Sequence, residues 1–394
     1  MVSSGAAEAC AVVIGGHING MSAIRSLWDS QYRRIAVLDW ESAPAFRSRK
    51  ITAYGRFPSS GEGLLNVLRR LQKSYGYLVP FPTNDVALSL LFEIRSEIRD
   101  FCFLPFNERT LLPAMSKTVQ YRKCEELGIS IPRTIEIGTS ADIDQLSDGR
   151  RYLLKPAKRN EGLDEVFRNH ILEPDALDEL RPTLVRYLER GVEFLASDIV
   201  PGGDEFVYAY TGYRSKLGAI TGGWVGRKLN QCPDDYGVMS SATAEFHSTV
   251  EEHGRALLEG LELHGICEPE FKLDPRDGKF RLMEINLRSM MWHRVGTLVG
   301  VNLQAHQMAD ALGIDPPNGV QDMQHSPHFI SLAHELENLA GRPRYTRNFL
   351  RNLRGGDLRE YALLDRQDPG PFVTSIPQLG RSVVSGCRKR LRGE

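Results

Sequence analysis

The sequence of 394 residues contains few cysteines, and these lack the spacings that cysteine chemistry requires. Its six cysteines are scattered without a CxxC pair, at positions 10, 102, 124, 232, 267 and 387. This scatter argues against a disulfide framework and against a zinc ribbon, because both need cysteines at close and regular spacing. It fits a protein that works in a reducing compartment.

Long hydrophobic runs and an excess of one charge are missing as well. No apolar run approaches the ~20 residues that a membrane-spanning helix needs. The first apolar run is preceded by no basic residue, so we expect no signal peptide and a cytoplasmic location. The 49 basic side chains balance 50 acidic ones, a total that gives no support for a nucleic-acid partner.

Stretches typical of strands alternate with stretches typical of helices in the first part of the chain. The alternating patterns lie at 11–16, 19–31, 34–40, 61–76 and 77–91. Such alternation is typical of a parallel α/β sheet. We therefore predict an α/β, Rossmann-like domain over residues 1–112.

A second region with mixed α+β patterns follows over residues 113–315. Strand patterns lie at 150–158, 193–213, 216–229, 269–273 and 279–286, and helical patterns at 116–128, 173–191 and 248–265. From 318 onward the pattern weakens into short helical pieces. We treat residues 316–394 as a C-terminal extension that ends in the basic tail CRKRLRGE. A solvated terminus is the favoured interpretation of this tail, and contact with an anionic partner or a membrane surface is the alternative.

The stretch IGGHING, residues 14–20, follows a strand and opens a helix, as a dinucleotide-binding turn does. Its glycines form GGxxxG rather than GxGxxG, and an acid such as Asp39 ends the second strand of many α/β sheets. We therefore favour a structural turn over a bound NAD, and an NAD-linked oxidoreductase remains the less favoured alternative.

The segments PEFKL and KFRLMEIN flank DPRDG, a Pro/Asp/Gly turn that indicates a β-hairpin. If Leu273 pairs with Lys279, then Glu270, Glu284 and Asn286 point to one face, because side chains alternate with period two. Two carboxylates and an amide oxygen suit Mg²⁺. A solvated strand face with ordinary ion pairs is the alternative.

Cations elsewhere in the chain favour the metal interpretation. Lys117 opens a helix, Lys155 lies late on an apolar strand, and Arg227 and Lys228 follow the strand AITGGWVG. Arg288 continues the face of the paired acids. Metal ligands together with several separated cations are typical of a triphosphate site.

With these motifs the chain resembles the ATP-grasp superfamily over residues 10–315. The resemblance implies an ATP-grasp fold over 113–315, with a lid part at 113–210 and a metal and phosphate part at 211–315. It implies that Glu270, Glu284 and Asn286 bind Mg²⁺ and that Lys117, Lys155, Arg227 and Lys228 contact the phosphates. It also implies that Asp198 and Glu205 contact the adenine or ribose, and that Arg288 meets phosphate or an acyl intermediate. Relatives usually carry Glu where this chain has Asp198, and their phosphate-covering loop has more glycines than KPAKRNEGLDE.

Within the superfamily the chain is most similar to carboxylate–amine ligases of the D-aspartate ligase type. That likeness implies ATP and Mg²⁺ (or Mn²⁺) as cofactors and small carboxylate and amine substrates, either amino acids or a cell-wall or peptide precursor. The catalytic residues would be Arg288, Arg227 and Lys228, with Trp292 and His293 in the substrate pocket or, alternatively, packed as structural residues. A carboxylase-like or purine-pathway-like ligase and a non-catalytic nucleotide-binding protein stay open, as does a homo-oligomer.

Overall fold

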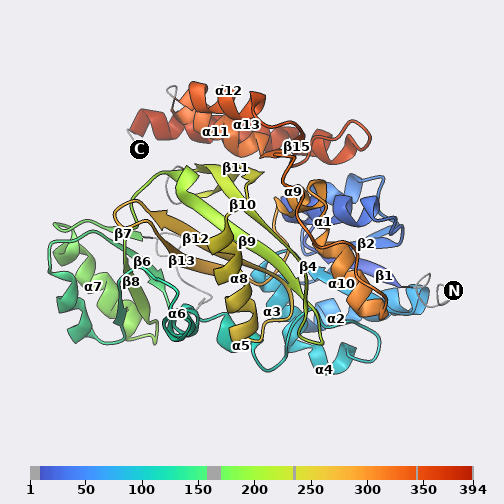
Figure 1. Ribbon diagram of the computed structural model, residues 1–394, viewed down its shortest axis with the longest axis horizontal. Helices are drawn as coiled ribbons and strands as arrows, with labels where there is room; N and C mark the ends of the chain where they lie inside the picture. Colours follow the sequence, from blue (N-terminus) through green and yellow to red (C-terminus); the bar gives the residue numbers. More distant parts are fainter. Residues whose placement is uncertain (1–8, 158–169, 234–236, 343–344, 393–394) are drawn as a thin grey trace.

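The computed structural model describes residues 9–157, 170–233, 237–342 and 345–392 (Figure 1). A four-stranded parallel sheet, in the order β3-β2-β1-β4, forms the N-terminal domain. Its elements are β1 (Cys10–Ile14), α1 (Ile18–Asp29), β2 (Ile35–Asp39), η1 (Pro44–Arg47), β3 (Ala53–Arg56), α2 (Gly61–Tyr75), β4 (Leu78–Pro82), α3 (Asp85–Glu93), α4 (Arg95–Ile98) and α5 (Leu111–Ala114).

Helices cover both faces of this sheet, and the alternation along β1 explains why. Val12 and Ile14 pack in one cluster with residues of α2 and α3, whereas Ala11 and Val13 pack in another with residues of α1. A strand buried on both sides carries a continuous apolar run, which is the pattern of residues 11–14. The Rossmann-like expectation for this domain agrees with the parallel sheet.

Contacts inside the domain hold the glycine-rich turn after β1. Gly15 has a φ of 101°, which glycine adopts without strain. A Cβ atom at Gly20 would lie 2.1 Å from the Gly15 carbonyl oxygen. The buried Asp39 carboxylate accepts a hydrogen bond from the Gly16 amide at 2.7 Å, so it anchors the turn and is not presented to a ribose. These contacts support the structural interpretation of IGGHING.

A smaller antiparallel sheet, in the order β5-β8-β6-β7, has its own hydrophobic core and lies at the left of Figure 1. It follows α6 (Lys117–Glu126), which ends before Gly128 at a positive φ of 68°. Its elements are β5 (Thr134–Ile137), η2 (Ser140–Leu146), β6 (Tyr152–Pro156), β7 (His170–Leu172), α7 (Leu177–Leu188) and β8 (Phe194–Asp198).

The largest sheet has the order β13-β12-β9-β10-β11-β14-β15. Its first part consists of η4 (Asp204–Phe206), β9 (Val207–Arg214), β10 (Ile220–Cys232), β11 (Val238–Ala244), α8 (Ser248–Gly260), β12 (Gly265–Asp274) and β13 (Lys279–Asn286). The helix α8 packs against β9. The strands β12 and β13 at one edge carry the acids singled out in the sequence.

The C-terminal extension adds strands as well as helices. After α9 (His293–Leu298) and α10 (Leu303–Leu312), the chain forms β14 (His328–Ile330), α11 (Leu332–Gly341), α12 (Thr346–Arg354), β15 (Arg359–Tyr361) and α13 (Gly370–Arg392). The prediction of helical pieces alone is wrong here, because β14 and β15 extend the largest sheet. Each has three residues, too few to display an alternating pattern.

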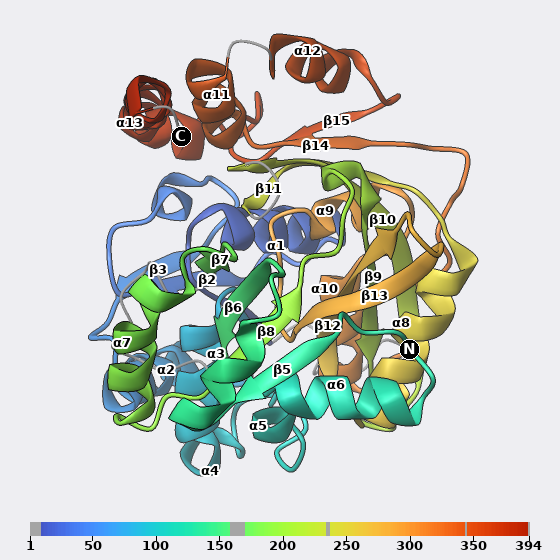
Figure 2. The ribbon, with the colours of Figure 1, turned by 90° about the vertical axis from the view of Figure 1, so that its left-hand side faces the viewer.

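The helices α11, α12 and α13 form a layer over the β14–β15 end of the largest sheet, with α11 between the other two (Figure 2). Every helix in the described part of the chain is too short or too polar to pass through a bilayer.

Candidate functional site

Two glutamates face each other on the β12–β13 hairpin. Glu270 lies directly opposite Glu284, and Glu268 lies opposite Asn286. A β-bulge produces this pairing, because Met283 has no partner on β12. The carboxylates therefore share one face of the sheet, as predicted from the sequence.

The predicted register itself is wrong by one residue. Leu273 pairs with Phe280 rather than with Lys279, and Leu282 lies opposite Phe271 in the hydrophobic core. Without the bulge this shift would turn the two acids to opposite faces, since side chains alternate along a strand. The bulge compensates for the shift.

Lysines from three different elements surround this acid pair. Lys117 begins α6, and its Nζ lies 3.5 Å from Glu284 Oε2. Lys228 on β10 places its Nζ 2.7 Å from Glu270 Oε2. Lys155 comes from β6 of the smaller sheet and lies close enough to Lys117 and both acids to respond to their charges. We call these five residues the acid–lysine cluster.

The expected pair of adjacent cations, Arg227 and Lys228, is divided between the two faces of the largest sheet. Lys228 shares the face of Glu270, whereas Arg227 lies in register with Tyr208 on the opposite face. The Arg227 guanidinium binds Glu245, with Nη2 2.7 Å from Oε2. Of these two neighbours, Lys228 alone joins the acid–lysine cluster, because successive strand residues point in opposite directions.

Burial and mutual charge shift the pKa values within the cluster. Burial, reinforced by the positive charge of Lys117, lowers the pKa of Lys155 to about 7. Burial of the Glu284 carboxyl group disfavours its ionisation, but the positive charges of Lys117, Lys155 and Lys228 outweigh this effect and lower its pKa to about 2. Burial and the negative charge of Glu284 raise the pKa of Glu270, against the opposing effect of Lys228.

The oxygen atoms of Glu270, Glu284 and Asn286, from two carboxylates and one amide, are of the kind that a hard divalent cation prefers. Asn286 donates from Nδ2 to Glu268 Oε1 at 3.3 Å, so its oxygen is the atom left to face a ligand. Among the described residues, no group of three or more His, Cys, Asp or Glu side chains is placed to hold a metal by itself. Water and phosphate oxygens would complete the coordination, as is usual for Mg²⁺.

Glu268 is the centre of a buried hydrogen-bonded network behind the acid pair. Its Oε2 accepts hydrogen bonds from Trp292 Nε1 and His293 Nε2, each at 2.8 Å. The Met290 amide donates to His293 Nδ1, so the ring proton lies on Nε2. Trp292 and His293 are 1% and 0% exposed, so in this structure they orient Glu268 and, through it, Asn286.

Arg288 continues β13 toward the N-terminal domain, where it meets a residue that the sequence analysis missed. Its Nε lies 2.8 Å from Oδ1 of Asp85, the first residue of α3. The two residues are 203 positions apart, and no spacing in the sequence relates them. Only the capping pattern of Asn84 and Asp85 at the start of α3 marks this position.

Asp198 and Glu205 stand on either side of the turn between β8 and β9. Asp198 ends β8, where Arg150 Nη1 lies 3.2 Å from Oδ2. Glu205 lies in η4, and its carbonyl oxygen accepts from Arg227 Nη1 at 3.4 Å. Neighbouring Asp204 is used internally, because its carboxylate accepts two hydrogen bonds from Gln231. The adenine or ribose contacts remain predictions.

Part of the predicted loops lies outside the described residues. Residues 158–169, which contain most of KPAKRNEGLDE, belong to this group, and residues 234–236 also lie outside the described part of the chain. The ends of the loops are described, since β7 begins at His170 and β11 occupies Val238–Ala244.

No family model matches the chain. A sequence relative is a D-aspartate ligase from Enterococcus faecium (strain Aus0004), which is 26% identical over 247 residues. The match covers 60% of this chain and 58% of the ligase, so the chain matches less than two thirds of that relative's length.

Solved structures match more of the chain at lower identity. The N5-carboxyaminoimidazole synthetase from Staphylococcus aureus, complexed with ADP, has a TM-score of 0.63 at 14% identity, covering 86% of this chain and 85% of that one. The L-amino acid ligase from Bacillus licheniformis has a TM-score of 0.56 at 16% identity, covering 78% and 74%. The biotin carboxylase from Campylobacter jejuni has a TM-score of 0.61 at 13% identity, covering 80% and 74%. The chain therefore has the ATP-grasp fold, as its sequence predicts, and is related in sequence to a D-aspartate ligase.

Proposed function

We propose that the chain is an ATP-dependent carboxylate–amine ligase that forms an amide through an acyl phosphate. The acid–lysine cluster is the observation that carries the proposal. It gathers two opposed carboxylates and three lysines from α6, β6 and β10 within an ATP-grasp fold. The sequence relative named D-aspartate ligase and the structural neighbour named L-amino acid ligase support the same class.

Each member of the cluster has a role in this proposal. Glu270, Glu284 and the Asn286 amide oxygen would hold Mg²⁺, or Mn²⁺ in its place, which would supply positive charge against the phosphates. Lys117, Lys155 and Lys228 bind the polyphosphate of ATP. In the protein without nucleotide, these lysines and glutamates offset one another's charge, and on binding the lysines would turn to the phosphates and the glutamates to the metal.

The reaction then proceeds by two displacements. A carboxylate oxygen of the first substrate attacks the γ-phosphorus of ATP, the bond to ADP breaks, and an acyl phosphate forms. The amine nitrogen attacks the acyl carbon, phosphate leaves, and the nitrogen loses a proton. Positioning and charge compensation are what the protein contributes. Arg288, held by Asp85 at the junction with the N-terminal domain, offsets the charge of the acyl phosphate.

The substrates belong to the class of small carboxylates and amines, and we propose amino acids or a cell-wall or peptide precursor among them. Trp292 and His293 do not touch the substrate in this proposal, since both side chains are buried. They instead position Glu268 and, through it, Asn286. Asp198 and Glu205 are proposed neighbours of the adenine and ribose.

The test is ADP release with Mg²⁺, ATP and a panel of amino acids and cell-wall precursors, with products identified by mass spectrometry. We expect release to require a carboxylate and an amine together, and Glu284→Ala to lower kcat at least 100-fold. Glu259→Ala, at an exposed position on α8, is the matched control and should retain activity. Equal activity of wild type and Glu284→Ala would refute the metal assignment, and nucleotide binding without turnover would indicate a non-catalytic protein.

A second candidate keeps the acyl phosphate chemistry but uses bicarbonate as the acid. The fold-level neighbours named N5-carboxyaminoimidazole synthetase and biotin carboxylase favour it. Including bicarbonate as one arm of the same panel separates the candidates, because bicarbonate-dependent ADP release without an organic acid would support this second function.

A further inference from the structure

The outer side of α13 exposes apolar side chains in one stripe. Val373, Ile376, Val383 and Val384 are 57%, 51%, 37% and 50% exposed. Ile376, Val383 and Val384 follow Val373 by three, ten and eleven positions, a spacing that places all four along one helix face, and the exposed Cys387 continues it. A contiguous stripe of exposed apolar residues is typical of a surface that binds a protein, a membrane or a ligand.

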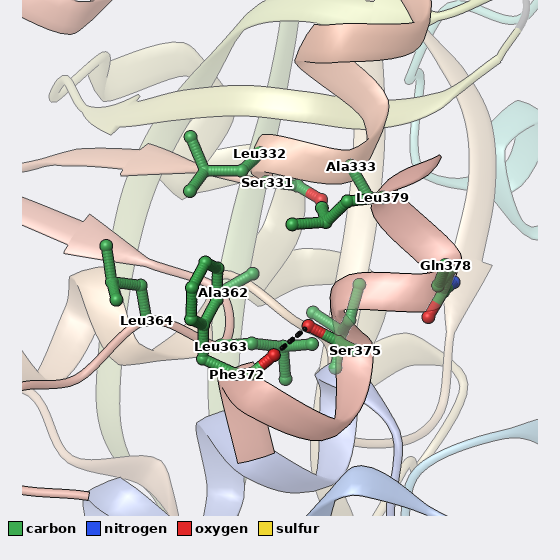
Figure 3. A pocket seen from close by; sticks show the side chains of 11 residues that line it. Ser331, Leu332, Ala333, Ala362, Leu363, Leu364, Phe372, Ser375, Gln378 and Leu379 are labelled. Carbon is green, nitrogen blue, oxygen red and sulfur yellow. Dashed lines mark hydrogen bonds between the residues drawn. The ribbon is translucent and has the colours of Figure 1, made fainter. Parts of the chain in front are cut away.

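The opposite side of α13 is already occupied. Phe372, Ser375 and Leu379 point inward to a small cavity that is also lined by Leu332 of α11 (Figure 3). Ile18 of α1 lines the same cavity. Ser375 donates from its hydroxyl to the Phe372 carbonyl oxygen at 2.8 Å, so it needs no outside partner. The inner face therefore fixes α13 against α11 and leaves the apolar stripe outward.

Positive charge surrounds the stripe. The 23 residues of α13 include no acid, and Arg381 and Arg388 are exposed. On the other side of α11, the helix α12 presents Arg347, Arg351 and Arg354 on one exposed face, also without an acid in the helix. Within the described residues, none of these five arginine side chains forms an ion pair with a carboxylate. Both helices belong to the same outer layer (Figure 2).

We propose that this layer binds the surface of an anionic lipid bilayer, with α13 lying in the interface and α12 providing further positive charge. We call it the basic–apolar face, formed by the outward residues of α12 and α13 named above. Charge complementarity selects this occupant. A second copy of the chain would bring like-charged arginines together, whereas anionic headgroups neutralise them. The helix is too polar to span the bilayer, and an interfacial position needs only one apolar face.

The test is co-sedimentation of the full chain with vesicles of phosphatidylcholine alone or with about 30% phosphatidylglycerol. We expect binding to the anionic vesicles only, weakening as NaCl rises from about 0.05 to 0.5 M, since salt screens the attraction. Arg347→Gln with Arg351→Gln should lower the partition coefficient roughly 20- to 30-fold, at about fivefold for each basic residue. Ile376→Ser with Val384→Ser should lower it at least tenfold.

The control pair is Arg69→Gln with Arg70→Gln, exposed on α2 at the far side of the molecule, which should bind like wild type (Figure 1). Cys387 offers a second readout, because the other five cysteines are buried and a polarity-sensitive fluorophore would label it selectively. Its emission should shift to shorter wavelength on anionic vesicles. Equal binding to neutral and anionic vesicles would overturn the proposal. So would binding that is unchanged both in the arginine pair at 347 and 351 and in the apolar pair at 376 and 384. If the chain dimerises without lipid and Val384→Ser abolishes the dimer, a second copy of the chain covers the stripe and the proposal is overturned.

Discussion

The lysines of the acid–lysine cluster differ in how firmly they hold their protons. Lys155 has a pKa of about 7 because burial and Lys117 disfavour its charge, whereas the neighbouring carboxylates raise the pKa of Lys228 above its usual value despite burial. At pH 8 the Lys155 amine is therefore mostly neutral in the free protein. A polyphosphate beside it would reverse this, since an adjacent negative charge favours the protonated form.

We predict that ADP binding at pH 8 takes up protons, up to one per nucleotide, and that the uptake disappears below about pH 6, where Lys155 is already charged. Titration calorimetry in two buffers with different ionisation enthalpies measures it. Lys155→Arg should still bind ADP but take up no proton, because arginine stays charged throughout. Proton uptake that is unchanged in Lys155→Arg would contradict this account.

Lys228 is expected to be a major source of stability for the nucleotide-free cluster. Lys228→Met leaves the Glu270 carboxylate without its partner at 2.7 Å, and we expect a loss of about 3 kcal/mol near pH 8. The variant raises the Glu270 pKa further. Protonation then relieves the unpaired charge at low pH, so the loss should shrink toward pH 5.

Urea denaturation with EDTA at pH 5 and pH 8 measures this difference. The matched control is Arg151→Met, which breaks the exposed ion pair with Glu173 at 2.7 Å and should change stability by less than about 1 kcal/mol. A loss in Lys228→Met that is the same at both pH values would show that the effect is not due to Glu270 ionisation.

At the scale of elements, the strand β13 and the first turn of α1 depend on backbone geometry more than on side-chain type. The bulge beside Glu270 decides that both acids share a face. The close approach of α1 to Gly15 decides that position 20 is glycine. Neither feature follows from hydrophobic periodicity.

Gly20→Ala should destabilise the N-terminal domain by about 1–3 kcal/mol, because the new Cβ would lie 2.1 Å from a backbone oxygen that cannot rotate away. Gly380→Ala is the control, since nothing lies within 4 Å of a Cβ there and alanine favours a helix. Thermal unfolding of both variants separates the effects. A stable Gly20→Ala protein would mean that α1 moves easily.

At the scale of the whole molecule, a buried ion cluster joins the two ends of the chain. Arg25 on α1 is 3% exposed, and its Nη1 donates to Glu360 Oε1 at 2.7 Å and to the Tyr361 carbonyl oxygen at 2.6 Å. Lys50 of the N-terminal domain reaches Asp365 at 2.6 Å. The C-terminal extension is therefore tied to the N-terminal domain as well as to the largest sheet.

Removing this junction should loosen distant segments together. In Arg25→Ala we expect hydrogen exchange to accelerate both in α1 and around β15, because Glu360 loses a buried partner. Arg33→Ala, which removes a surface contact with Trp28, is the control and should leave β15 unchanged. Acceleration confined to α1 would mean that β15 is held by its pairing with β14 alone.

Much of the fold was accessible from local patterns. The strand and helix alternation of the first domain, the hairpin around DPRDG and the lysines at the starts and ends of elements all depend on short-range preferences. The short strands β14 and β15 were missed because three residues carry no period. The hairpin register was missed by one position because Lys279 pairs with Asp274 rather than Leu273, and the alternation of apolar residues does not fix where the turn ends.

By itself, the sequence determined the α/β alternation and the residue types of the cluster, because these depend on local periodicity and motif spacing, and its resemblance to the ATP-grasp superfamily predicted the fold. The tertiary structure decided which of those residues meet. It joined Lys155 to the acids from another sheet, turned Arg227 away from Lys228, used Glu268 to hold Asn286, and paired Arg288 with Asp85. Contacts between residues far apart in the chain arise from how sheets and helices stack, and one sequence does not encode that stacking locally.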